Sequence, residues 1–206
     1  MTWATVAGIC IVITAALGLI FLIPFVVVVF HPSSKHKTSF FILAGWLGIA
    51  DGLCLLLMIG YAAPSTIMEQ NLAEIKINQT QINKTLTDKR VNAIMGGLLN
   101  VGWFSSLPLI VFAAVDQWLC FCHRQCFNSV FTQQRTQFYI CACWVFGISY
   151  SMPSFMNCCP LYFWFDLISW GWSLDHSGSA VLAIGELVIT ILVFTITYLC
   201  NAMVLR

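Results

Sequence analysis

The sequence predicts an all-α integral membrane protein in which five apolar helices form a transmembrane bundle. Hydrophobic residues make up 60% of the chain and charged residues only 8%. A soluble domain carries about 25% charged residues. The apolar residues gather in five long stretches, and within these they do not alternate with polar residues as they would in the strands of a membrane barrel.

Each stretch is close to the length that a membrane helix requires. Roughly 20 apolar residues cross the hydrocarbon core as a helix. Because no water reaches this core, every backbone N–H and C=O needs an internal partner, which a helix provides. The stretches cover residues 4–30, 40–64, 93–118, 138–156 and 180–205. We therefore expect a single transmembrane domain over residues 1–206.

Few charges interrupt the five stretches. The first contains none, and it lacks the basic start and the A-x-A cleavage pattern of a secretory signal. The second contains Asp51 alone, and the third meets only Asp116 near its end. The fifth contains Glu186 near its start. An ionisable group inside a membrane span is costly, so each of these carboxyl groups is a candidate functional residue.

The polar connections predict how the chain is oriented. The connections before the second and fourth stretches carry two Lys or Arg residues each, and the one before the fifth carries none. Basic residues favour the cytoplasmic side. The connection before the third stretch carries four Lys or Arg residues, which weakens the argument from charge. The same connection holds two glycosylation sequons, at Asn78 and Asn83, and these favour the external side. We expect glycosylation at both asparagines and a multi-pass plasma-membrane protein, with the N-terminus outside and the C-terminus in the cytoplasm.

Several segments together resemble one family of membrane receptors. They occur in this order: Gly18-Leu-Ile-Phe21, Ser39 through Asp51-Gly52-Leu53 to Pro64, Ala113-Ala-Val-Asp116-Gln-Trp118, Phe127 to Thr132, and the aromatic Ser169-Trp-Gly-Trp-Ser-Leu-Asp175. The set resembles the nematode serpentine receptors of class x (Srx), which are seven-helix chemoreceptors similar to G-protein-coupled receptors. The resemblance implies that the five stretches correspond to the first five helices of a rhodopsin-like receptor, and that this chain ends after the fifth.

The resemblance also implies a function. A receptor of this class binds an external small molecule and signals to a cytoplasmic heterotrimeric G protein. Asp51 would be the carboxylate of an interior polar network, and Asp116, Gln117 and Trp118 would face the G protein. Gln117 stands where rhodopsin-like receptors carry Arg, so the usual acidic–Arg latch cannot form. The alternatives are an Asp51 satisfied by neighbouring helices and a capping or interfacial Asp116.

Polar residues in the outer part of the third and fifth stretches are candidate ligand-binding residues. Glu186 lies about two turns into the fifth stretch. It can meet a cationic or hydrogen-bonding ligand, reach the headgroup layer, or pair with another helix. Asn100 and Trp103 in the third stretch are further candidates for the lining of a pocket.

The cysteines leave several interpretations open. No Cys lies between Tyr61 and Leu119, so the bridge that commonly ties the aromatic loop of seven-helix receptors to their third helix cannot form. The pairing of Cys158 and Cys159 is therefore undetermined. The segment Cys120-Phe-Cys-His-Arg-Gln-Cys126 contains three Cys and one His, but the spacing is not that of a standard zinc knuckle. Palmitoylation or plain interfacial cysteines are the other interpretations.

The sequence indicates no catalytic or cofactor function. It has no Gly-rich phosphate loop, no H-E-x-x-H and no Ser, His and acid at a familiar spacing. We therefore expect no enzyme, no cofactor and no metal. The net charge of +1 favours no nucleic acid. The expected partners are membrane lipids, a small-molecule chemosensory ligand, a G protein and a second copy of the chain. The alternative function is a non-signalling truncated receptor or another small multi-span scaffold.

Overall fold

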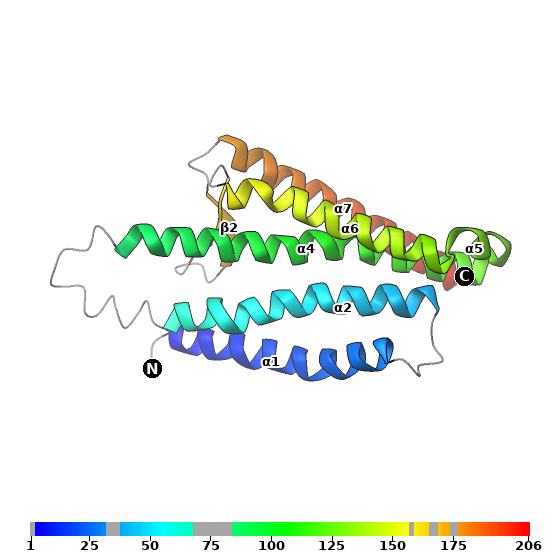
Figure 1. Cartoon of the computed structure of the whole chain (residues 1–206), viewed down its shortest axis with the longest axis horizontal. Helices are drawn as coiled ribbons and strands as arrows, with labels where there is room; N and C mark the ends of the chain where they lie inside the picture. Colours follow the sequence, from blue (N-terminus) through cyan, green and yellow to red (C-terminus); the bar gives the residue numbers. More distant parts are fainter. Residues whose placement is uncertain (1–2, 32–37, 68–83, 157–158, 165–168, 174–176) are drawn as a thin grey trace.

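Five long helices lie side by side along the long axis of the molecule (Figure 1). The computed structural model describes residues 3–31, 38–67, 84–156, 159–164, 169–173 and 177–206. The long helices are α1 (Trp3–Phe30), α2 (Ser39–Leu57), α4 (Lys84–Cys122), α6 (Gln133–Phe155) and α7 (Ser177–Val204). Each contains a segment long and apolar enough to cross a membrane, which confirms the predicted five-helix membrane fold.

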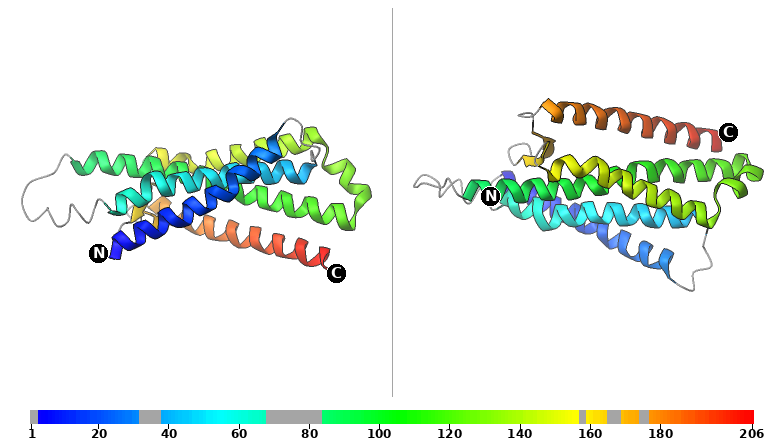
Figure 2. Two further views of the ribbon diagram at one scale, coloured as in Figure 1. Left: turned by 90° about the horizontal axis from the view of Figure 1, so that it is seen from below. Right: turned by 45° about the horizontal axis from the view of Figure 1, so that its top comes forward.

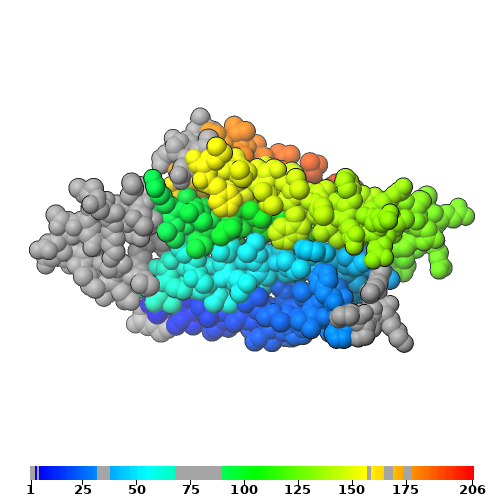
Figure 3. All heavy atoms as spheres, viewed as in Figure 1, coloured from blue at the N-terminus to red at the C-terminus, as the bar shows by residue number. Residues whose placement is uncertain are grey.

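The central helix is α4, which packs against α2, α6 and α7. In the right view of Figure 2, α1 and α7 lie on opposite sides of the group formed by α2, α4 and α6. On the face that Figure 3 shows, the atoms of α2 lie directly against those of the helices above it, so side chains fill the space that separates these ribbons in Figure 1. Most side chains in the spans of α1 and α7 remain exposed or half-buried. Apolar helices with such exposure are suited to contact with lipid.

Glycines allow α4 and α6 to approach each other closely. A Cβ atom on Gly147 of α6 would lie 2.1 Å from the hydroxyl oxygen of Ser105 and 2.8 Å from the carbonyl oxygen of Val101, both on α4. Membrane helices rely on such contacts because lipid supplies no hydrophobic force to drive them together. The absence of a side chain at Gly147 therefore sets the distance between the two helices.

The second span changes its helical type near one end. After α2, residues Met58–Ala62 form the π-helical segment η1, and the helical span continues to Ile67. A π-helical turn inside an α-helix inserts one extra residue and frequently marks a functional position. Tyr61 in η1 contacts the aromatic loop, as described below.

Two connections expected to be loops contain helical residues in the part of the chain that the structure describes. The third apolar stretch is expected from residue 93, yet α4 begins earlier, at Lys84. After Cys122, a further helix, α5 (Arg124–Val130), lies in the next connection, between α4 and α6. The guanidinium of Arg135 donates to the carbonyl oxygen of Ser129, near the end of α5, where carbonyl groups lack helical partners. Hydropathy marks the part of a helix inside hydrocarbon, so it misses turns that continue into the polar layers.

The aromatic connection before α7 forms a β-hairpin instead of a loop. Strand β1 (Leu161–Trp164) pairs antiparallel with β2 (Ser169–Trp172), with Leu161 opposite Trp172 and Phe163 opposite Trp170. Leu161 and Phe163 are buried, whereas Trp164 on the other face is exposed. This alternation is what a strand with one covered face requires. The hairpin lies at the same end of the bundle as the N-terminus, which we call the hairpin end (Figure 1).

Candidate functional site

The hairpin contacts four helices of the bundle. The Ser154 hydroxyl of α6 donates to the carbonyl oxygen of Cys159, just before β1, at 3.3 Å. On the η1 side, the ring of Tyr61 lies 6.0 Å from that of Trp170. The contact with α4 is made through the backbone of β1, and the contact with α7 through the side chain of Trp172. The hairpin thereby joins elements that are far apart in the sequence.

The contact with α7 involves the one acidic side chain predicted to bind a ligand. The indole Nε1 of Trp172 donates to Oε2 of Glu186 at 2.8 Å. Trp172 is buried and Glu186 is half-buried. A hydrogen bond to an ionised carboxylate is stronger than one between neutral groups. A carboxylate offers about four acceptor positions, so one indole N–H leaves capacity for further donors.

A tyrosine of α6 lies near this carboxylate and packs on a phenylalanine of α4. The hydroxyl of Tyr150 donates to the carbonyl oxygen of Leu182, one helical turn before Glu186, at 2.8 Å. The ring of Tyr150 packs on Phe104 with centroids 3.9 Å apart. Gly185 makes room for this arrangement, since a Cβ there would lie 2.8 Å from the Tyr150 hydroxyl. The site thus combines one carboxylate with an apolar aromatic wall.

The two other predicted ligand residues occupy different environments. Asn100 is 3% exposed, and its side-chain nitrogen has no hydrogen-bond partner among the described residues. It lies one turn before Phe104, so both fall on one side of α4. Trp103 is 39% exposed and is not part of that buried surface. Asn100 is therefore the better placed of the two to line a site among α4, α6 and α7.

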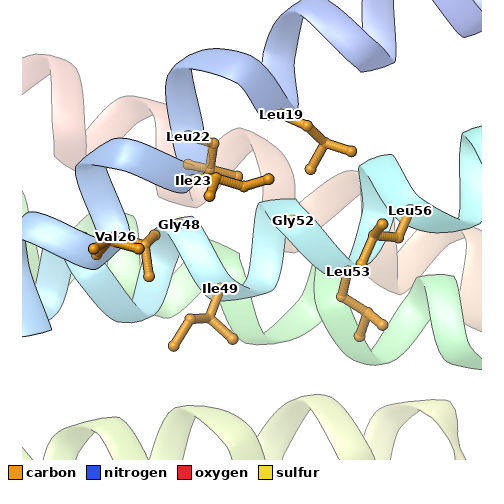
Figure 4. A pocket seen from close by; sticks show the side chains of 10 residues that line it. Leu19, Leu22, Ile23, Val26, Gly48, Ile49, Gly52, Leu53 and Leu56 are labelled. Atoms are coloured by element: carbon orange, nitrogen blue, oxygen red, sulfur yellow. The ribbon is translucent and has the colours of Figure 1, made fainter.

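A groove between α1 and α2 is lined by other residues. It has a volume of about 390 Å³ and an entirely apolar lining that includes Leu22, Val26, Gly48, Gly52 and Leu56 (Figure 4). Ligand sites usually add a few polar groups to such a lining, because these fix the orientation of the ligand. Without them, the groove is a poor candidate for selective recognition.

The residues predicted to face a G protein lie at the opposite end of the bundle, beside α5, which we call the α5 end. Asp116 is 2% exposed and accepts a hydrogen bond from the hydroxyl of Ser39, in the first turn of α2. Gln117 and Trp118 are half-buried, and the Trp118 ring lies 5.2 Å from that of His123. The structure thus gives Asp116 a hydroxyl partner on another helix.

A comparison with protein families decides the identity of the chain. The model of the family described as serpentine type 7TM GPCR chemoreceptor Srx matches residues 12–206, nearly the whole sequence. The chain belongs to the Srx family. No curated protein matches it. The match confirms the resemblance found in the sequence and identifies a multi-pass, receptor-like membrane protein of a chemoreceptor family, which is not a family of enzymes.

Asp51 of this Srx chain belongs to neither the hairpin site nor the Asp116 pair. Asp51 is exposed on α2, and no hydrogen bond to it occurs among the described residues. Its assignment to an interior network stays a prediction. Asn78 and Asn83, the predicted glycosylation sites, and Cys158 lie outside the described residues. Cys159 is buried against Gly178, where a Cβ would lie 2.6 Å from its sulfur.

Several contributors to the site in this Srx chain were not singled out from the sequence. Tyr150 lies in an apolar stretch and gave no signal of its own. Asn92 was overlooked at the polar start of the third stretch. Trp172 was noted only as part of the aromatic loop, although the run Leu-Tyr-Phe-Trp, rich in residues that favour strands, could have suggested a hairpin.

Proposed function

We propose that this Srx chain is a chemosensory receptor that binds an external small molecule at the hairpin end and signals to a cytoplasmic G protein at the α5 end. The observation that supports it best is the half-buried Glu186 carboxylate, which accepts a hydrogen bond from Trp172 near Tyr150, whose ring packs on Phe104. Membership of a chemoreceptor family supports the same function.

The chemistry of the site favours a ligand with a donor group and an apolar body. Glu186 can accept from an ammonium or hydroxyl group, and the aromatic wall can cover a short hydrocarbon. An anionic ligand would be repelled by the carboxylate. A primary alkylamine combines the charge and the apolar surface that this arrangement accommodates.

We expect the purified full chain in lipid nanodiscs to bind hexylamine more tightly than hexanol and to bind hexanoic acid weakly. Replacing Glu186→Gln keeps the shape of the side chain but removes its charge. Because hydrogen bonds to charged groups contribute about 1.5–3 kcal/mol, hexylamine affinity should fall about 10- to 100-fold. Quenching of tryptophan fluorescence measures the binding.

A matched control lies on the same helix. Thr195 of α7 is exposed and bonds its own helix at the carbonyl oxygen of Ile191, so Thr195→Val should leave hexylamine affinity unchanged. Equal affinities of the native chain and Glu186→Gln for hexylamine would contradict the proposed site. Binding without any G-protein response in cells that express the chain would instead favour the non-signalling alternative.

A further inference from the structure

Asn92 of α4 forms two hydrogen bonds with the backbone of one hairpin residue. Its Nδ2 donates to the carbonyl oxygen of Phe163 at 3.2 Å, and its Oδ1 accepts from the Phe163 N–H at 2.8 Å. Strand β1 has β2 on one side only, so its other edge presents backbone groups that need partners. The amide of Asn92 satisfies both groups of Phe163 and so takes the place of a neighbouring strand.

Gly96, one turn after Asn92, brings β1 directly onto the helix. A Cβ atom on Gly96 would lie 2.0 Å from the carbonyl oxygen of Leu161, so any larger residue would push the strand away. Residues four apart lie on one face of a helix, which places Gly96 and Asn92 under the same strand. We call these two residues and their contacts with β1 the α4 clasp.

The α4 clasp contacts the strand residue that pairs with Trp172. Leu161, which rests on Gly96, is the cross-strand partner of Trp172. Trp172 in turn donates to Glu186 on α7. Because no cysteine lies between Tyr61 and Leu119, a disulfide from this part of α4 cannot hold the hairpin.

We propose that Asn92 is a positioning residue that holds the hairpin on α4 by hydrogen bonds, so that Trp172 reaches Glu186. The part of this inference that concerns ligand affinity rests on the proposed function. The part that concerns the hairpin does not, since the position of the strands can be measured without any ligand.

Hydrogen–deuterium exchange of the full chain in lipid nanodiscs tests the clasp directly. In Asn92→Ala, the amide of Phe163 and the rest of the hairpin should exchange about tenfold faster or more, while the amides within the α4 and α6 spans stay protected. Asn92→Asp keeps the acceptor for the Phe163 N–H but loses the donor. The exchange rate of its hairpin amides should therefore fall between those of the native chain and Asn92→Ala. Asn128→Ala, an exposed asparagine on α5, is the matched control.

The outcomes separate the clasp from the proposed function. Unchanged hairpin exchange in Asn92→Ala would overturn the clasp. If that variant does not fold, Gly96→Ala provides the second test, and native-like hairpin exchange there would have the same meaning. Faster exchange together with weaker hexylamine binding, partly restored in Asn92→Asp, supports the full inference. Faster hairpin exchange in a chain that never binds hexylamine supports the clasp and contradicts the proposed ligand site.

Discussion

Asp116 shows how a single carboxyl group is accommodated among apolar helices. It is almost fully buried, and the hydroxyl of Ser39 donates to it. Ser39 opens α2, where the first backbone N–H groups lack helical partners and the helix dipole favours negative charge. The sequence could indicate Asp116 as a capping or interfacial residue. Its partner Ser39 lies 77 positions away, however, and only the fold brings the two residues together.

Removing the Ser39 hydroxyl should destabilise the protein, because the buried Asp116 loses a hydrogen-bond donor. In Ser39→Ala, Asp116 keeps its place but loses a donor, so we expect the free energy of unfolding to fall by about 1–3 kcal/mol. Thermal unfolding of the detergent-solubilised chain measures this change. Ser129→Ala is the control, because the Ser129 hydroxyl bonds its own helix at an exposed position. Equal melting temperatures for the two variants would contradict the role of Ser39.

At the scale of helices, contacts between elements depend on residues that sequence patterns do not reveal. Length and hydropathy predicted all five spans, because apolar content determines whether a helix can enter hydrocarbon. They did not predict the hairpin, whose strands are short and depend on contacts such as that of Asn92 with Phe163. They also gave no sign that Gly147 sits against the backbone of α4.

Two glycine substitutions should have opposite effects. Gly147→Ala puts a methyl group against backbone atoms of α4, so we expect a destabilisation of about 1–3 kcal/mol. Gly60→Ala meets nothing within 4 Å, so the helical preference of Ala should leave stability unchanged or raise it by about 0.5–1 kcal/mol. Melting temperatures of the two variants, prepared in the same detergent, test the contrast. A Gly147→Ala chain as stable as Gly60→Ala would show that α6 can shift without cost.

At the scale of the whole molecule, the predicted orientation places the hairpin end on the external side of the membrane. If Asn78 and Asn83 lie outside, both sequons meet the glycosylation machinery. We expect expressed protein to gain mobility on a gel after treatment with an N-glycosidase, and Asn78→Gln combined with Asn83→Gln to abolish this shift. Asn201→Gln, on α7 and outside any sequon, should retain it. A glycan that persists in the double variant would contradict the orientation.

The site could be predicted only in part from the sequence. Glu186 stood out because a carboxylate is rare in an apolar span, and the structure gives it a buried indole partner. Asn100 is a polar amide in an apolar span, and it lies on the buried side of α4. Trp103 was an equally reasonable candidate, but the rotation of α4 leaves much of it exposed. That rotation depends on the packing of several helices together, which no single segment encodes.

The length of α4, compared with the thickness of a bilayer, bears on how solutes approach this molecule. Its 39 residues span about 58 Å, whereas a bilayer with its headgroups measures about 40–45 Å. The helix is therefore longer than such a bilayer is thick, and the hairpin contacts it at Asn92, near the end that begins at Lys84. The groove between α1 and α2 is instead lined by residues within two apolar spans. We therefore expect water-soluble molecules to reach the hairpin end from water and oily molecules to reach the groove from lipid, so that partitioning sorts them before binding.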